Sequence, residues 1–127
     1  MSQSLALVAL IVPDYDEAIA FFTRTLRFTL VTDEDQGRKR WVTLRPPGGG
    51  SDLLIARADS EAQRVAIGQQ GGGRVWLFLH TEDFARDHAA LTAAGIAFEE
   101  PPRHEPYGTV AVWRDPWGNR WDLIEPR

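Results

Sequence analysis

The chain has no cysteine in its 127 residues, and it also lacks a long hydrophobic run. Without cysteine there are no disulfide bonds, no thiol nucleophile and no zinc site with cysteine ligands. The longest apolar run covers residues 5–12 and is far too short to span a bilayer. The first residues lack the basic segment and apolar core of a signal peptide. We therefore expect a soluble, cytoplasmic protein with no membrane partner.

Positive charge is also scarce, with 14 Lys and Arg against 18 Asp and Glu and a formal net charge of −4. The longest basic block is Arg38–Arg40, which is too small for the electrostatic footprint of a nucleic-acid-binding protein. We therefore expect no nucleic-acid partner. In contrast, the five tryptophans exceed what the core of one small domain needs, so we expect some of them to face a cavity.

Hydrophobic periodicity predicts an α+β fold built from two βαβββ modules within a single domain spanning 1–127. The first module, 4–57, opens with a buried strand and a helix that Asp14 and Glu17 begin as a capping box. A glycine-rich connector with about one helical turn follows at 58–73, and the second module occupies 74–126. The strands expected in the two modules are 5–12, 28–32, 40–45 and 52–56, then 74–80, 96–99, 108–114 and 119–125; the second helix is expected at 82–94.

Two motifs in this duplicated pattern resemble those of the vicinal oxygen chelate superfamily, which includes glyoxalase I, bleomycin-resistance proteins and extradiol dioxygenases. One opens the chain, at residues 12–22 with 26–28, and the other closes it, at residues 114–123. The resemblance implies a U-shaped mixed sheet with helices outside and a ligand or metal on the concave side. It also implies a homodimer, which is common in this superfamily.

The resemblance places metal ligands on the first and last strand of each module. Here these positions hold Leu7, Trp76, the acid-free stretch 53–55 and Asp122. Leucine and tryptophan donate no lone pair to a metal, and a single carboxylate holds a divalent ion weakly. We therefore expect no cofactor, with Asp122 as a weak metal candidate; a divalent metal held in an altered geometry is the alternative.

Strand alternation predicts which side chains enter the cavity. Trp76, Phe78 and His80 share one face of their strand, while the residues between them, with Val75, face the helices. A helix-capping role for His80 is the alternative. The loop 101–108 precedes the hairpin and is placed to fold over the cavity mouth. The ligand-binding candidates are Leu7, Trp41, Trp76, Phe78, His80, Tyr107, Trp113, Arg120 and Asp122.

Three functions compete on these observations. The first is a small-molecule binding protein of the bleomycin-resistance type that sequesters an aromatic or planar ligand without the usual metal. The second is a glyoxalase-like lyase, isomerase or dioxygenase acting through Asp122, with His80 or Glu105 as further catalytic candidates. The third is a dimeric interaction module whose tryptophans are buried between two chains.

Overall fold

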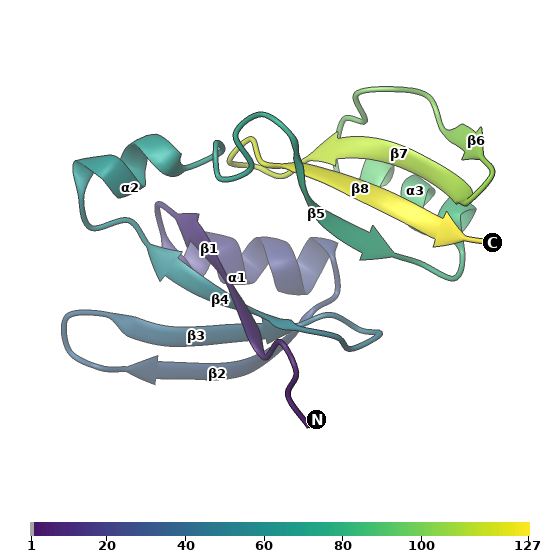
Figure 1. The fold of residues 1–127 in the computed structure, drawn as a ribbon. Helices are drawn as coiled ribbons and strands as arrows, with labels where there is room; N and C mark the ends of the chain where they lie inside the picture. The colour runs from purple at the N-terminus through teal and green to yellow at the C-terminus, as the bar shows by residue number, and fades with distance from the viewer. Residues whose placement is uncertain (1) are drawn as a thin grey trace. The chain divides into compact units, whose positions relative to one another are not determined.

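The structure is a computed structural model, and it describes residues 2–127. The chain divides after Ile67 into two compact units, each with a four-stranded mixed sheet and helices (Figure 1). The expected α+β class with a duplicated strand pattern is confirmed. None of the helices in the described part of the chain is long and apolar enough to cross a membrane.

The first unit arranges its strands in the order β1-β4-β3-β2. Strand β1 pairs in parallel with β4, and the other neighbours are antiparallel. The elements are β1 (Leu7–Val12), α1 (Tyr15–Ala20), the π-helix η1 (Phe21–Thr25), β2 (Thr29–Asp35), β3 (Arg40–Arg45), β4 (Asp52–Arg57) and α2 (Glu61–Ala66).

Helix α1 begins as the capping box predicts, because Oδ2 of Asp14 accepts a hydrogen bond of 2.8 Å from the backbone N–H of Glu17. The helix packs over β3 and β4. Ala18 and Phe22 from the helical segment are fully buried, as are Leu10 of β1 and Val42 of β3. These apolar side chains form the core of the first unit.

The second unit has the equivalent strand order, β5-β8-β7-β6. Strands β5 and β8 are parallel, and the two remaining pairs are antiparallel. Helix α3 begins at the N-cap Asp83 and contacts β8. The elements are β5 (Val75–His80), α3 (Phe84–Ala93), β6 (Arg103–Glu105), β7 (Gly108–Arg114) and β8 (Arg120–Pro126).

One strand of the second unit was predicted in the wrong place. Residues 96–99 form no strand and contribute a single bridge between Phe98 and Trp113, whereas the fourth strand is β6, inside the expected loop. The two prolines at positions 101 and 102 explain the shift, because proline has no backbone N–H to donate to a sheet. The chain resumes pairing with β7 only at Arg103.

The hairpin turn between β7 and β8 is held by the buried carboxylate of Asp115. It accepts hydrogen bonds from the backbone N–H of Trp117 and Asn119, from the Asn119 side chain and from the Trp121 indole, at 2.9–3.0 Å. Gly118 sits in this turn with φ 98°, a conformation that glycine adopts without strain. Much of the closing motif therefore builds the turn.

Candidate functional site

A row of side chains crosses the sheet of the second unit on one face. The strand register places Phe78 of β5 beside Asp122 of β8, and Asp122 beside Val112 of β7. The next pair along the strands, Trp113 with Trp121, belongs to the opposite face because strand side chains alternate. We call the side bearing Phe78, Val112 and Asp122 the open face.

A β-bulge in β5 changes which residue joins the open face. The register shifts between Val75 and Leu77, so Val75 pairs with Arg120 and lines the same pocket as Asp122. The alternation expected for residues 75–79 is therefore wrong at Val75, because the bulge inserts one extra residue, Trp76, into the strand.

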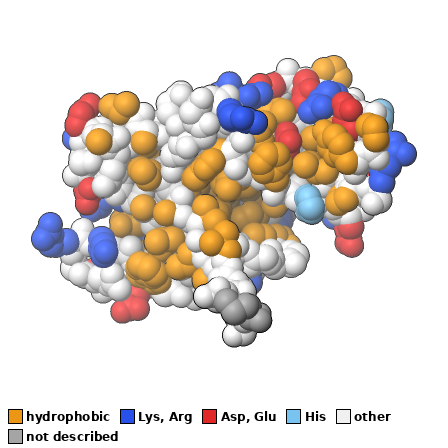
Figure 2. Space-filling model, in the orientation of Figure 1, with side chains coloured by type: hydrophobic (Ala, Val, Ile, Leu, Met, Phe, Trp, Pro, Cys, Tyr) orange, Lys and Arg blue, Asp and Glu red, His pale blue; other side chains and the backbone are white. Residues whose placement is uncertain are grey.

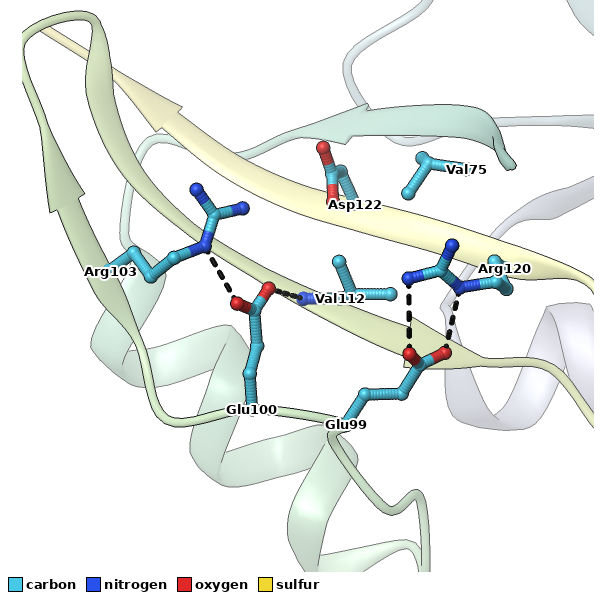
Figure 3. A pocket seen from close by; sticks show the side chains of 7 residues that line it. All are labelled: Val75, Glu99, Glu100, Arg103, Val112, Arg120 and Asp122. Atoms are coloured by element: carbon cyan, nitrogen blue, oxygen red, sulfur yellow. Dashed lines mark hydrogen bonds and ion pairs between the residues drawn. The ribbon is translucent and has the colours of Figure 1, made fainter. Parts of the chain in front are cut away.

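A pocket of about 330 Å³ lies on the open face, a volume at the lower end of the range of small-molecule sites (Figure 3). Its wall combines two valines with five charged side chains. The lining residues are Val75, Glu99, Glu100, Arg103, Val112, Arg120 and Asp122.

Asp122 is the unusual member of this set. The residue is only 8% exposed, and its Oδ1 accepts no hydrogen bond from any residue of the described chain. Burial raises the pKa of the Asp122 carboxyl above its ordinary value, since desolvation disfavours the charged form. A buried acceptor without a donor is costly, and such groups are rare in folded proteins.

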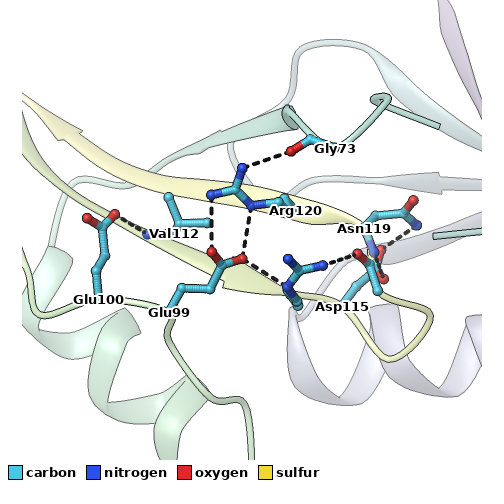
Figure 4. A network of polar contacts seen from close by, with 9 residues as sticks. Gly73, Glu99, Glu100, Val112, Asp115, Asn119 and Arg120 are labelled. Carbon is cyan, nitrogen blue, oxygen red and sulfur yellow. Dashed lines mark hydrogen bonds and ion pairs between the residues drawn. The ribbon is translucent and has the colours of Figure 1, made fainter. Parts of the chain in front are cut away.

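The other carboxylates at this pocket are paired with guanidinium groups. Arg120 forms two hydrogen bonds to Glu99, at 3.0 and 3.1 Å (Figure 4). Arg114 approaches the same carboxylate at 3.0 Å. The bonds from Arg120 hold the pKa of Glu99 below its usual range. Arg120 also donates to the carbonyl of Gly73 at 3.0 Å.

A second ion-paired group lies at the β6 side of the pocket. Arg103 donates to Glu100 at 2.7 Å and to Glu105 at 3.0 Å. The other oxygen of Glu100 accepts a hydrogen bond of 3.1 Å from the backbone N–H of Val112, which ties this glutamate to β7. Both pocket arginines are therefore engaged by glutamates, and Figure 3 shows no such bond to Asp122.

The remaining sequence-predicted candidates of the second unit are dispersed. Phe78 is 60% exposed on the open face, and Tyr107 is 55% exposed in the turn between β6 and β7. His80 is exposed at the end of β5, and Asp83 rather than His80 caps α3. Trp113 is fully buried and stacks on Trp121 with ring centroids 5.0 Å apart, so it belongs to the core instead of the pocket wall.

Trp76 also lies outside the set of pocket-lining residues. It is half-buried at the bulge, and its Cβ packs against Gly71, where an added Cβ would approach it to 2.8 Å. Gly71 has no side chain, and the space that a Cβ would fill there is occupied by Trp76 and the carbonyl of Arg74.

Leu7 and Trp41 belong to the first unit and share one face of its sheet. Each alternates with core residues of its own strand, Leu7 with Leu10 and Trp41 with Val42, so both point away from that core. Both side chains are half-buried. Figure 2 shows hydrophobic side chains gathered over β1, β3 and β4 of this unit.

Sequence reasoning missed five lining residues, namely Val75, Glu99, Glu100, Arg103 and Val112. Glu99 and Glu100 reach the pocket because the backbone of Glu99 donates to the carbonyl of Val112 at 2.8 Å. The sequence signal that could have identified them is the group of charged residues at 99, 100 and 103 beside two prolines.

The donor set does not fit a metal ion. Within residues 2–127, no group of three or more His, Asp or Glu side chains is arranged to hold one. Asp122 is the one pocket carboxylate without a guanidinium partner, and a single carboxylate holds a divalent ion weakly against water.

Comparison with known proteins agrees with the fold and the duplicated motif. An uncharacterized protein of Shewanella frigidimarina (strain NCIMB 400) is 50% identical over 98% of this chain and 95% of its own length. The crystal structure of UcmS2 superposes with a TM-score of 0.84 at 30% identity, covering 98% of this chain and 99% of that one. TnmS3, an antibiotic-binding protein from Streptomyces sp. CB03234, gives a TM-score of 0.78 at 26% identity, covering 100% and 98%.

A family model matches nearly the whole chain, at residues 4–123. It describes the superfamily that the two sequence motifs resemble, so that expectation is confirmed. The chain belongs to the Glyoxalase/Bleomycin resistance protein/Dioxygenase superfamily.

Proposed function

We propose that the chain is a small-molecule binding protein that sequesters a planar or aromatic compound on the open face of the second unit, without the metal that many relatives use. The observation that carries this proposal is the buried carboxylate of Asp122, whose Oδ1 lacks a hydrogen-bond donor in a pocket of ligand size. The similarity to the antibiotic-binding TnmS3 supports the same class of function.

The surroundings of Asp122 supply surface for a flat apolar group. Phe78 lies beside Asp122 on the open face and is 60% exposed, which is unusual for a phenylalanine in a free domain. Val75 and Val112 add apolar wall to the pocket. A ring that stacks on Phe78 and covers the valines would bury these side chains and place its polar group at Asp122.

An enzymatic role through Asp122 is the second candidate. Burial raises the pKa of Asp122 and so moves it toward the range of a general base. Glu105, proposed as its partner from the sequence, is bound to Arg103 and is not among the pocket-lining residues. His80 does not line the pocket either, so such an enzyme would depend on Asp122 alone.

We also propose a homodimer in the cytoplasm. Each four-stranded sheet has two edge strands, β1 and β2 in the first unit and β5 and β6 in the second. Open edges of this kind are commonly covered by pairing with a second copy. The absence of cysteine is compatible with a reducing compartment.

The proposal is tested by screening planar aromatic antibiotics and metabolites for saturable quenching of tryptophan fluorescence. A hit is titrated against the wild type, Phe78→Ala and the control Val65→Ala. Val65 is 66% exposed on α2, so its truncation removes an apolar side chain of similar exposure from the other unit.

We expect Phe78→Ala to weaken binding about tenfold, since a stacked ring contributes contact area and roughly 0.5–1.5 kcal/mol beyond it. The control should bind like the wild type. Equal affinities for all three proteins would contradict the proposed site, and turnover of the compound would favour the enzyme.

A further inference from the structure

We propose that the pocket of the second unit selects a ligand carrying a protonated amine, which Asp122 accepts as its ion-pair and hydrogen-bond partner. This inference rests on the proposed function and names the chemical class of its ligand. It follows from the balance of charge in the pocket, from the unsatisfied oxygen of Asp122 and from the apolar surface beside it.

The pocket carries one negative charge more than it can neutralise. Its lining has three carboxylates, on Glu99, Glu100 and Asp122, against the two guanidinium groups of Arg103 and Arg120. Each guanidinium is bound to a glutamate, at 2.7 Å for Arg103 and 3.0 Å for Arg120. Asp122 is therefore the carboxylate left over.

The next neighbours do not change this balance. Glu105 adds a negative charge through its bond to Arg103, and Arg114 adds a positive one through its contact with Glu99. The two additions cancel. Figure 2 shows the same mixture on the surface of the second unit, where red and blue side chains alternate.

The unsatisfied oxygen of Asp122 sets the polarity of the ligand group. Oδ1 is buried and needs a donor, and an ionised carboxylate is an acceptor only. The two arginines that could donate are already committed to glutamates. A ligand N–H is therefore the missing partner, and a positive charge on it would also offset the excess negative charge.

An anionic ligand fits the same pocket poorly. It would meet Asp122 directly, and it could recruit Arg103 or Arg120 only by breaking bonds of 2.7–3.1 Å to their glutamates. Binding of a carboxylate or phosphate here would break ion pairs within the protein and would add repulsion from Asp122.

The test compares three probes that share one ring system and differ in charge. They are naphthylmethylamine, naphthalenemethanol and naphthoate in the same positional isomer, titrated into the full chain at neutral pH by calorimetry up to millimolar concentration. We expect the amine to bind about tenfold more tightly than the alcohol, because charge-assisted hydrogen bonds are the stronger kind, and naphthoate to bind most weakly.

Two variants assign the preference to Asp122. Asp122→Asn keeps the side-chain shape and should bring the amine and the alcohol to about the same affinity. Glu82→Gln removes one negative charge from an exposed position of the same unit outside the pocket, and it should keep the wild-type preference.

The outcomes separate this inference from the proposed function. If amine and alcohol bind wild type equally, or if Asp122→Asn leaves the preference intact, the amine selectivity is overturned while the binding pocket stands. If none of the probes binds at millimolar concentration, the inference is overturned as well, and screening of the wider panel against Phe78→Ala then decides on the proposed function.

Discussion

The indole Nε1 of Trp121 donates a 3.0 Å hydrogen bond to the buried carboxylate of Asp115. The residue after Trp121 is a second buried aspartate, Asp122, whose Oδ1 has no hydrogen-bond donor among the described residues. Asp115 is 4% exposed and Asp122 is 8% exposed. Neighbouring residues of β8 point to opposite sides of the sheet, so Trp121 joins the core while Asp122 reaches the pocket. The two aspartates should therefore respond to mutation in opposite ways.

Replacing Asp115 with alanine should destabilise the protein strongly. The change leaves the Trp121 indole and the buried amide groups of Asn119 without their acceptor. We expect a loss of roughly 2–4 kcal/mol in the free energy of unfolding, measured by urea denaturation. Asp59→Ala, at an exposed position, is the control and should lie within about 0.5 kcal/mol of wild type. An unchanged Asp115→Ala midpoint would contradict a structural role.

Replacing Asp122 with asparagine should instead raise the thermal midpoint at neutral pH. Burial raises the pKa of Asp122 in the folded chain, so the folded state holds this proton more tightly than the unfolded state. The resulting stability is present below the unfolded pKa and is lost as pH rises through the folded pKa. The ionised carboxylate is therefore a net cost at neutral pH.

The pH dependence checks this assignment. The advantage of Asp122→Asn should shrink as the pH falls from neutral through the raised pKa of Asp122 in the folded state. It should be smallest once the pH reaches the ordinary aspartate pKa, because the carboxyl is then largely protonated in the folded protein. Thermal unfolding of both proteins across this range measures the effect. A variant less stable than wild type at neutral pH would show that the carboxylate serves the fold.

The metal content of the purified protein should stay below one equivalent. Asp122 is the one acid among the superfamily's usual ligand positions, and the described residues form no group able to hold a metal. Elemental analysis after dialysis against a chelator measures this directly. Stoichiometric zinc, iron, manganese or nickel would favour the enzymatic alternative.

The mass in solution should correspond to two chains. Edge strands in both sheets favour pairing with a second copy, as proposed above. Light scattering after size exclusion at micromolar concentration measures the mass. A value near the 14.3 kDa of one chain would contradict the dimer.

Local sequence signals predicted most of the fold. The capping role of Asp14 and the bounds of β3, Arg40–Arg45, came directly from spacing and strand alternation. Asp122 and Arg120 were placed on one face by the same alternation, and the structure brings both into one pocket. These features depend on neighbouring residues alone.

Long-range features of the site could not be predicted from spacing. The bulge at Trp76 moves Val75 to the open face, and nothing in the residue types marks a one-residue insertion in an apolar strand. Glu99 and Glu100 reach the pocket through hydrogen bonds to Val112, a contact between segments separated in the sequence. Trp113 was assigned to the pocket wall because the superfamily resemblance places no ligand position on its strand, and so does not decide which side of the sheet Trp113 faces.

The most direct test of the binding site is an amide chemical-shift titration of the isotope-labelled full chain with the tightest compound from the screen. We predict saturable shifts concentrated at Val75, Val112 and Asp122, which line the pocket, and saturation only at a higher concentration of the compound in Phe78→Ala. A second pocket, lined by His88 and Phe98, adjoins this one through Glu99 and Glu100. Saturable shifts centred on His88 and Phe98, with the amides of Val75, Val112 and Asp122 unmoved, would contradict the account.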